Sequence, residues 1–426
     1  MVKEAGMGEW KRVSLKDAGI TLIDCDHRTP PASDNGYPYI AIPQLKGGRL
    51  DLSDVRRISP AHYAEWTRKA KPKHHDVILS RRCNPGETAY VPADLECALG
   101  QNLVLLRADG TKVFPPFLRW LVRGPDWWEQ INTFLNVGAI FDSLKCADIP
   151  NFKLPLPPLP EQKRIAHILG TLDDKIELSQ RMNATLEAMV WALFKSWFVD
   201  FDPVRAKIDG RKPEGMDAET AALFPSEFQE SPLGPIPKGW ATGTLGDICL
   251  NPRRGVKPNE IEPQTPYIAL EHMPRRSIAL SEWNESANVA SGKLSFRKGE
   301  ILFGKLRPYF HKVGVAPVNG VCSTDILVLS PKSLEWLGLV LCHTSSDELI
   351  QFTDLASTGT KMPRTSWNDI SSFKVVLPPR SIATAFTRII QPMLNHIHAN
   401  IHQTRTLATL RDTLLPSLLN ETNGSV

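Results

Sequence analysis

The sequence has no cysteine pair spaced like a metal-binding or redox motif. Its seven cysteines are scattered and include no CxxC pair (Cys25, Cys83, Cys97, Cys146, Cys249, Cys322 and Cys342). An odd number of cysteines without regular spacing is typical of reduced thiols in a cytoplasm. We therefore predict a cytoplasmic protein without a disulfide framework and without a metal site.

Long apolar runs are also missing. No run approaches the ~20 residues that are needed to span a bilayer. The first residues, MVKEAGMGEWKRV, lack the apolar core of a secretion signal, so we expect neither secretion nor a membrane partner. The chain has 426 residues, of which 42% are hydrophobic and 23% are charged. This length and composition are typical of a globular protein with two cores of ordinary size.

The usual motifs of catalysis are absent as well. GEILFGKL at 299–306 has the spacing of a phosphate-binding loop, but Leu306 stands where Ser or Thr would bind magnesium, so we predict a strand leading into a turn. The sequence has no Asn-Pro-Pro-Tyr-type loop for base methylation and no glycine-rich cofactor loop after a strand. The histidines of HHD at 74–76 and of the pair His398/His402 favour a surface role, and Asp173-Asp174 is expected on the solvated side of a helix. We therefore predict a recognition protein with no catalytic residue and no cofactor of its own.

What the sequence does contain is a long internal repeat. DIPNFKLPLPP at 148–158 and DISSFKVVLPP at 369–379 are identical at seven of eleven positions, with a constant offset of 221. Further pairs match in the same order: a glycine before each segment (Gly138 and Gly359), PYIA at 38–41 and 266–269, DVIL at 76–79 with EILF at 300–303, and NLVLL at 102–106 with DILVL at 325–329. The fold is therefore predicted to occur twice, as a pseudo-twofold object with two similar surfaces.

Each half is predicted to be α+β. Short apolar runs separated by Gly, Pro, Asn and Asp indicate strands and turns over the first ~140 residues of each half. A proline-rich strap follows (LPLPPLP in one half, VVLPP in the other), which must be extended because proline excludes helix. Residues 200–238 are rich in Pro, Gly and charge and predict a linker with one short helix.

A long amphipathic helix follows each strap. The first helix, at about 161–198, has an a/d heptad stripe. Its first row consists of positions 165, 172, 179, 186 and 193, and its second row consists of positions 168, 182 and 189. The equivalent row of the second helix is 386, 393, 400, 407 and 414, with Ile389 and Leu410 in the other row. Both stripes become polar in the middle, at Lys175 and Ser179 in the first helix and at His396, Asn400 and Gln403 in the second. We predict that the helices pair as an antiparallel coiled coil; two independent bundles, or helices that bind a partner, are the alternatives.

Positive charge is concentrated in both halves. Residues 56–82 contain eight Lys and Arg against two acidic residues, and the second half has PRRGVK at 252–257, PRR at 274–276 and GKLRPYFHK at 304–312. Any one of these clusters could be a solvated face. Their presence in both copies favours a polyanion as the partner.

The chain resembles a known family. LPPLPEQKRIAHILGTLDDKIELSQRMNATLEAMVWALFKSWFVDFDPV at 156–204 looks like the central conserved region of the specificity subunit of type I restriction–modification enzymes. PIPKGW at 235–240 and the second strap and helix are similar to that family too. One departure is LPPRSIATAF at 377–386, which lacks the Glu-Gln that follows the first strap.

The resemblance implies a domain plan. A first target recognition domain would occupy 1–158, a central conserved spacer helix 159–199, a linker 200–238, a second target recognition domain 239–380, a C-terminal conserved spacer helix 381–420 and a tail 421–426. Each recognition domain would read one half of a bipartite double-stranded DNA target. The helices would dock two modification subunits, which carry S-adenosylmethionine, and through them restriction subunits, which use ATP and Mg.

Within this plan we predict two sets of binding residues. The predicted DNA contacts are Arg56, Arg57, Lys71, Lys73, Arg81 and Arg82 in the first domain and Arg253, Arg254, Lys305, Arg307, Tyr309, Lys361 and Arg364 in the second. The predicted partner contacts are Trp191, Trp197 and Phe198 on the first helix. A self-contained DNA methyltransferase or nuclease and a twofold protein scaffold are the alternative functions.

Overall fold

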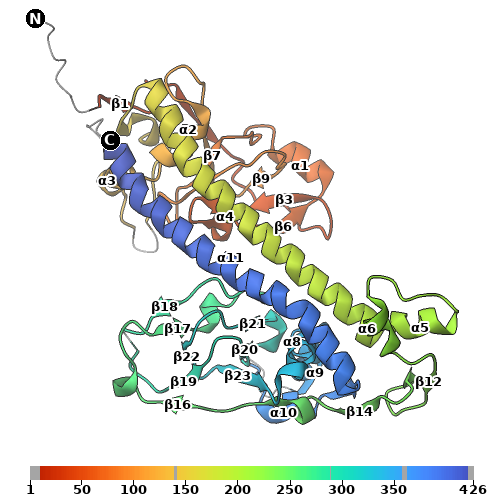
Figure 1. Cartoon of the computed structure of the whole chain (residues 1–426). Helices are drawn as coiled ribbons and strands as arrows, with labels where there is room; N and C mark the ends of the chain where they lie inside the picture. Colours follow the sequence, from red (N-terminus) through yellow and green to blue (C-terminus); the bar gives the residue numbers. More distant parts are fainter. Residues whose placement is uncertain (1–9, 139–141, 288, 357–361, 421–426) are drawn as a thin grey trace, which may run out of the picture. The chain divides into compact units, whose positions relative to one another are not determined.

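The computed structural model describes residues 10–138, 142–287, 289–356 and 362–420, which fold into two compact units (Figure 1). Unit 1 contains 1–174 and 407–426, and unit 2 contains 175–406. Two long helices, α4 (Leu159–Phe194) and α11 (Arg380–Asn420), each contribute one part to unit 1 and the other part to unit 2. The predicted tail at 421–426 lies outside the described residues.

Unit 1 is built on an antiparallel four-stranded sheet with the order β2 (Ile20–Asp24), β10 (Leu103–Ala108), β7 (Val77–Ser80), β8 (Thr88–Tyr90). A second sheet has the order β6 (Arg56–Ile58), β3 (Tyr37–Ile40), β9 (Ala98–Leu99), and β4 (Leu45–Lys46) forms a hairpin with β5 (Arg49–Leu50). Strand β1 (Arg12–Ser14) pairs with β11 (Lys153–Pro155), which is part of the predicted strap. The short helices are α1 (Pro60–Trp66), α2 (Pro115–Leu121) and α3 (Pro125–Phe134).

Unit 2 repeats this plan with a larger second sheet. Its four-stranded sheet has the order β15 (Cys249–Leu250), β23 (Ile326–Pro331), β20 (Ile301–Gly304), β21 (Val313–Val315). The second sheet has the order β16 (Gly255–Val256), β19 (Lys293–Phe296), β22 (Gly320–Cys322), β17 (Pro266–Ile268), β18 (Asn284–Glu285). Strand β14 (Ala241–Thr244) pairs with β24 (Lys374–Leu377), the second predicted strap. The short helices are α7 (Leu245–Ile248), α8 (Leu337–Thr344), α9 (Asp347–Ala356) and α10 (Trp367–Ser372).

The duplication predicted from the sequence is confirmed by this topology. The two four-stranded sheets have equivalent strand orders, and each strap pairs with the strand that opens its half. The matched PYI segments also behave alike, because β3 pairs parallel with β9 and β17 pairs parallel with β22. The segment 299–306, whose glycine and lysine spacing resembles a phosphate-binding loop, contains a strand as predicted, because β20 occupies its middle.

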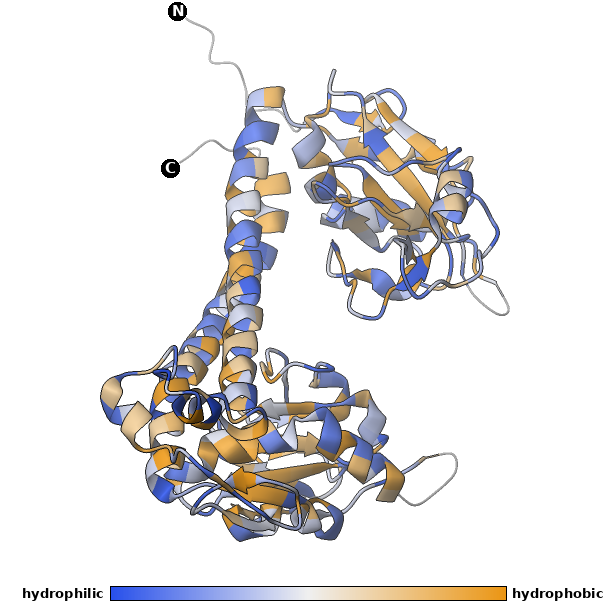
Figure 2. Ribbon diagram, turned by 90° about the vertical axis from the view of Figure 1, so that its right-hand side faces the viewer, coloured by the Kyte–Doolittle hydropathy of each residue, from blue (hydrophilic) through white to orange (hydrophobic). Residues whose placement is uncertain are grey.

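The central strands are buried on both faces, which explains their unbroken apolar runs. In β10, Val104 and Leu106 belong to one hydrophobic cluster of unit 1, while Leu103 and Leu105 belong to another. Side chains of a strand alternate between its two faces, so the sheet separates two cores. The strands of the four-stranded sheets of the two units are accordingly coloured mostly as hydrophobic in Figure 2.

The start of α4 is fixed by a side chain of the EQ motif. Gln162 is fully buried; its amide nitrogen donates to the carbonyl of Pro157 in the strap (2.8 Å), and its oxygen accepts from the backbone N–H of Phe114 (2.8 Å). The second copy has Ala383 at the equivalent position, yet α11 still begins directly after its strap. There Thr387 anchors the helix instead, because its hydroxyl donates to the carbonyl of Glu335 (2.8 Å).

The two long helices pair antiparallel, as predicted. In unit 1 the early α4 residues Ile165 and Leu169 share a core with Leu415 and Leu418 of late α11. In unit 2 late α4 packs against early α11, with Phe194 and Phe386 in one cluster. Each pairing is therefore formed inside one unit.

The predicted heptad register of the first helix is wrong in its second row. Met182 and Met189 are 36% and 46% exposed, whereas the buried positions are Ile176, Asn183 and Val190. The inward row thus follows the first row by four residues rather than three. The polar middle is confirmed at Asn400 but not at Ser179. The amide of Asn400 donates to the side-chain oxygen of Asn183 (2.9 Å) inside unit 2, whereas the Ser179 hydroxyl donates to the carbonyl of Lys175 (2.9 Å). Asn183 was not recognised because the predicted second row was placed one residue before the inward row to which it belongs.

The segment 200–238, predicted as a linker with one short helix, is more structured than that. It contains two short helices, α5 (Asp202–Ile208) and α6 (Ala218–Ala222), and a paired β12 (Phe228–Gln229) and β13 (Ile236–Pro237). Phe201, Val204 and Phe224 are buried in the core of unit 2. These widely spaced apolar residues anchor the segment although the residues between them are polar. Among the described residues, no helix is long and apolar enough to cross a membrane.

Candidate nucleic-acid interface

In unit 1 a basic loop, residues 81–87, joins β7 to β8. Arg81 donates its backbone N–H to the carbonyl of Asn102 (3.0 Å), and its own carbonyl accepts from the N–H of Leu144 (2.9 Å). The loop is thereby held between the turn before β10 and the chain that leads to the strap. We call it the unit 1 loop.

Unit 2 has the equivalent loop at residues 305–312, between β20 and β21. Lys305 donates its N–H to the carbonyl of Asp325 (2.9 Å), and its carbonyl accepts from Thr365 (3.0 Å). The same backbone framework therefore supports both loops. We call this one the unit 2 loop.

Both loops contain a residue with left-handed backbone at the same place. Cys83 has a φ of 65° and Arg307 a φ of 52°, each the third residue after the strand. Residues other than glycine adopt this conformation uncommonly, and they keep it only where the surroundings fix it. A repeated left-handed residue indicates that the loop shape itself is part of the duplicated design.

The unit 2 loop gathers four of the predicted DNA contacts. Lys305 and Arg307 are half-buried in it, and Tyr309 is 49% exposed. Arg364 reaches the same place because Leu306 and Arg364 form an antiparallel bridge, and the Arg364 guanidinium lies 3.5 Å from the Asp325 carboxylate. Lys361, predicted for this loop, lies outside the described residues.

The sequence reasoning missed two members of this cluster. The guanidinium of Arg275 lies 4.3 Å from the ring centre of Phe310, and that ring is 4.8 Å from the ring of Tyr309. The guanidinium of Arg307 lies 5.8 Å from the centre of the same Phe310 ring. Stacked arginine and aromatic side chains are suited to contact both phosphates and bases. The segment PRR at 274–276 gave a signal, but nothing in it predicted the contact with Phe310.

Arg253 and Arg254 are placed elsewhere in unit 2. Arg254 forms an ion pair with Glu300, the residue before β20, whereas the unit 2 loop follows the other end of that strand. Arg253 is exposed beside it, with a φ of 47°. A four-residue strand separates its ends by ~13 Å, so these two arginines do not belong to the loop cluster.

The unit 1 predictions divide in the same way. Arg81 is half-buried and donates to the carbonyl of Leu144 (3.3 Å), while Arg82 is exposed. Lys71 and Lys73 are exposed but precede β7, at the end of the strand away from the loop. Lys71 also lies 3.8 Å from the carboxylate of Glu96. Arg81 and Arg82 are therefore brought together, and the two lysines are not part of that group.

Arg56 and Arg57 belong to the second sheet of unit 1. Both are exposed on β6, and each donates to a backbone carbonyl, Arg56 to Pro30 (2.9 Å) and Arg57 to Gly36 (2.8 Å). Arg56 also lines a cavity of about 360 Å³ together with Asn102, whose carbonyl holds Arg81. Polar side chains of this cavity, including Gln44 and Gln101, were not predicted from the sequence.

Two of the three predicted partner contacts are buried. Trp197 and Phe198 are only 2% and 5% exposed, because α4 ends in a π-helical turn (Lys195–Val199) that directs both rings into the core of unit 2. The ring of Trp197 lies 5.1 Å from Phe224 and 5.8 Å from Phe386. Trp197 and Phe198, which were predicted as partner contacts, are therefore not accessible to a partner, and the folded 200–238 segment covers Trp197.

The third residue, Trp191, remains accessible. It is half-buried and lines a cavity of about 340 Å³ in unit 2, between the end of α4, residues 276–278 and the start of α9. Unit 1 has a cavity of about 360 Å³ at the equivalent place, lined by late α11, Gly47–Gly48 and the start of α3. The correspondence is close, since Leu415 and Pro416 stand 221 residues after Phe194 and Lys195. The duplication thus extends to a pair of matching cavities.

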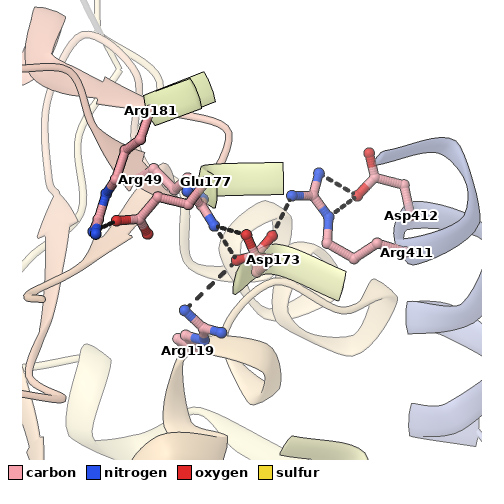
Figure 3. Close-up of polar contacts among 7 residues, drawn as sticks. All are labelled: Arg49, Arg119, Asp173, Glu177, Arg181, Arg411 and Asp412. Atoms are coloured by element: carbon pink, nitrogen blue, oxygen red, sulfur yellow. Dashed lines mark hydrogen bonds and ion pairs between the residues drawn. The ribbon is translucent and has the colours of Figure 1, made fainter. Parts of the chain in front are cut away.

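Asp173, expected on the solvated side of α4, is instead 1% exposed (Figure 3). Its carboxylate lies 2.6 Å from Arg411 of α11, 3.4 Å from Arg49 and 3.6 Å from Arg119. Arg49 also donates to the backbone carbonyl of Asp173 (2.7 Å). Burial alone would raise the pKa of Asp173, but the three guanidinium groups outweigh it and lower that pKa. This cluster ties both long helices to the domain of unit 1.

The predicted surface role of the histidine pairs is wrong for His398, which is buried, and agrees with the exposure of His74 and His402. His74 and His75 stack on each other with ring centres 3.6 Å apart. His398 is 6% exposed, and burial lowers its pKa to about 4. Among the described residues, the geometry identifies a different group of possible metal ligands, which is Asp24, Cys25 and His27.

Comparison with known proteins places this geometry in a family. Residues 7–188 and 237–405 match the family described as "Type I restriction modification DNA specificity domain". The chain belongs to this family. It is 25% identical to the Type I restriction enzyme HindI specificity subunit of Haemophilus influenzae, over 97% of this chain and 99% of that protein. It is 26% identical to the MjaIX specificity subunit of Methanocaldococcus jannaschii, over 85% of this chain and 81% of that protein.

A solved structure shares the fold. The crystal structure of a type I restriction-modification S subunit from M. genitalium aligns with a TM-score of 0.55 over 98% of both chains, at 15% sequence identity. Similarity at this level of identity supports the fold alone. Together with the duplicated sheets, it agrees with the predicted architecture of two α+β domains joined by two long antiparallel helices.

Proposed function

We propose that this chain is the DNA-reading subunit of a type I restriction–modification complex, and that each unit reads one half of a bipartite target. One observation carries the proposal: in a chain of the DNA specificity family, the same topological position of both units holds a basic loop on an equivalent backbone framework. Two equivalent loops on two similar domains are suited to two half-sites.

In unit 2, the residues proposed to contact DNA are Lys305, Arg307, Tyr309 and Arg364, with Arg275 and Phe310 added by geometry. In unit 1 they are Arg82 on the loop, Arg56 beside the cavity and Arg57, the next residue of β6. Basic side chains would hold phosphates and set the register, while polar and aromatic groups would meet base edges. Arg81 and Arg254 are engaged within the fold, so we expect them to support the surface.

The partners proposed for the chain are double-stranded DNA, two modification subunits and, through these, restriction subunits. One modification subunit would dock at each of the two matching cavities, which explains why the cavity beside Trp191 has a counterpart beside Leu415. In this proposal catalysis lies outside the chain and the complex works in the cytoplasm. The modification subunits would carry S-adenosylmethionine, and the restriction subunits would use ATP and Mg.

The experiment that tests the function is genome-wide adenine methylation by modification-sensitive single-molecule sequencing. The host with the gene is compared with the host without it. We expect the loss of one bipartite motif, two short half-sites around an unspecified gap. If every methylated motif persisted, the proposal would fail. Methyl transfer by the purified chain alone would instead establish the methyltransferase alternative.

A further inference from the structure

Three potential metal-binding side chains meet at the end of β2 in unit 1. They belong to Asp24, Cys25 and His27, and one ligand atom from each lies within 4.8 Å of the others. Donors on a tetrahedral zinc ion are about 3.5 Å apart, because zinc bonds are roughly 2.0–2.3 Å long. Movements of about 1 Å would therefore bring the three onto one ion.

The imidazole of His27 is oriented as in a metal site. Its Nδ1 lies 2.8 Å from the carbonyl of Gln101, which can only accept, so Nδ1 carries the hydrogen. In the neutral ring Nε2 then bears a lone pair, and it faces the Asp24 carboxylate at 3.0 Å. Two acceptors at this distance require a proton or a cation between them. A backbone carbonyl that fixes the far nitrogen is the usual outer contact of a metal-bound histidine.

The other two ligands complete a mixed donor set. The Cys25 sulfur is buried, 3.1 Å from the carbonyl of Gly100, and the carboxylate of Asp24 is half-exposed. The next carboxylate, Asp26, is already engaged by the guanidinium of Arg28 (2.8 Å) and does not compete. Thiolate, imidazole and carboxylate together are typical of zinc.

We propose that Asp24, Cys25 and His27 bind one Zn²⁺, with a water molecule in the fourth position on the solvent side. Binding replaces the S–H bond of Cys25 with a sulfur–zinc bond, and the proton passes to solvent. The carboxylate and the thiolate together balance the double positive charge of the ion.

The ion would hold residues 24–27 in one conformation. The hydrogen bond from His27 to the carbonyl of Gln101 would keep them on the turn at Gly100–Asn102, while the Cys25 thiol gives up its hydrogen bond to Gly100. The same turn accepts the backbone N–H of Arg81 and borders the cavity that Arg56 lines. No group of this kind occurs among the described residues of unit 2. The metal would therefore shape one half of the DNA surface only, a consequence that rests on the proposed function, whereas the site itself does not.

The test is metal binding by the purified full chain. We expect one equivalent of Zn²⁺ per chain by elemental analysis, and a thiolate-to-cobalt charge-transfer band when Co²⁺ is bound instead. Cys25→Ser should abolish the band, and His27→Asn should weaken Zn²⁺ binding at least ten-fold. Cys83→Ser, which changes an exposed cysteine of the unit 1 loop, and His74→Asn are the matched controls and should bind like the parent chain.

The outcomes separate clearly. Failure of the parent chain to bind Zn²⁺ or Co²⁺, a Co²⁺ spectrum without the thiolate band, or equal binding by Cys25→Ser would overturn the proposal. If Cys25→Ser does not fold, the exposed His27 still decides, because unchanged affinity in folded His27→Asn would also refute the site. None of these readouts depends on DNA, so a failure of the proposed function would not be confused with a failure of the metal site.

Discussion

The carboxylate of Asp173 is surrounded by the guanidinium groups of Arg49, Arg119 and Arg411 inside unit 1 (Figure 3). The three cations could not share this buried place without the anion, because like charges repel strongly where water is excluded. The residue thus links α4, α11, the β4–β5 hairpin and α2 through one charge. A buried charge of this kind is costly to leave without its counterion.

Asp173→Asn is therefore expected to destabilise unit 1 by about 3–5 kcal/mol. The amide keeps the size of the carboxylate but removes the charge that the three arginines require. Chemical denaturation followed by circular dichroism measures the change. Asp174→Asn, at the exposed neighbouring position, is the control and should shift the free energy of unfolding by less than about 0.5 kcal/mol. Equal effects of the two substitutions would show that the ion-pair cluster contributes little.

The same residue predicts a pH dependence. The pKa of Asp173 is lower in the folded protein than its ordinary value, so the folded state favours the ionised carboxylate. Its contribution is fully present above about pH 5 and is lost as the pH falls through the folded pKa. The gap in stability between the parent chain and Asp173→Asn should accordingly shrink on acidification. Denaturation curves at neutral and acidic pH measure it, and a constant gap would contradict this account.

The sequence could not reveal this cluster. Asp173 and Arg411 are far apart along the chain, and a pair of acidic residues on a helix is ordinarily solvated. Predicting the cluster would have required the correct heptad register of α4. The predicted second row of that helix (168, 182 and 189) lies one residue away from the row that faces inward. The basic residues of the unit 2 loop, by contrast, could be proposed as DNA contacts because their local sequence is unusual in both spacing and charge.

At the scale of elements, the polar contact between α4 and α11 in unit 2 rests on Asn183 and Asn400. Asn183→Leu leaves the Asn400 amide buried without its partner, which should cost about 1–3 kcal/mol. The double substitution Asn183→Leu/Asn400→Leu removes both groups and should recover most of that loss, at the expense of a less strictly fixed register. A double-mutant cycle by denaturation measures the coupling. Asn395→Ala, at an exposed position of α11, is the control, and additive effects of the two leucine substitutions would contradict the pairing.

Two tryptophans near the end of α4 have different roles: Trp197 stabilises the fold, and Trp191 is proposed to contact a partner. Trp197→Ala should destabilise unit 2 by about 3–5 kcal/mol, because it empties a fully buried site among aromatic rings. Leu178→Ala, on the same helix but 58% exposed, should leave the stability within about 0.5 kcal/mol of the parent. Thermal unfolding monitors both variants. A stable Trp197→Ala variant would mean that the 200–238 segment does not pack on α4 as described.

Trp191→Glu should behave differently. Its ring lines the unit 2 cavity, so a charge there is expected to weaken assembly with the modification subunit while the chain stays folded. Co-purification of the two subunits, with circular dichroism of the variant, measures both properties. Leu178→Glu is the matched control for adding an acidic residue to exposed α4. Undiminished assembly of Trp191→Glu would remove this cavity as a docking site.

The elements themselves were largely predictable, because their causes are local. Proline required both straps to be extended, although the last two residues of the first strap, Leu159 and Pro160, already belong to α4. The apolar periodicity predicted both long helices. The folded segment at 200–238 was missed because its few apolar side chains join a core built by residues outside it. Phe224 packs against Trp197, and the ring of Trp197 in turn lies against Phe386 of α11. Composition reports how polar a segment is, but it does not report whether a few apolar side chains find a core.

At the scale of the whole molecule, each unit has its own sheets and its own hydrophobic clusters. Packing changes in one unit should therefore leave the surface of the other intact. For a protein that reads two half-sites, this independence predicts that a substitution in one loop alters one half of the recognised motif. The unit 2 loop offers the better test because its cationic and aromatic side chains are already gathered.

Arg364→Ala/Tyr309→Ala should relax or abolish recognition of one half-site while the other half-site stays unchanged. Methylome sequencing of a host that carries the variant in place of the parent gene measures this directly. In purified complexes, loss of one phosphate contact should lower the slope of log affinity against log salt by about 0.9. Glu285→Ala, which changes an exposed acidic residue of β18, is the control within unit 2. Changes in both half-sites would mean that the units do not read DNA independently, and an unchanged motif with an unchanged salt slope would show that DNA binds elsewhere on unit 2.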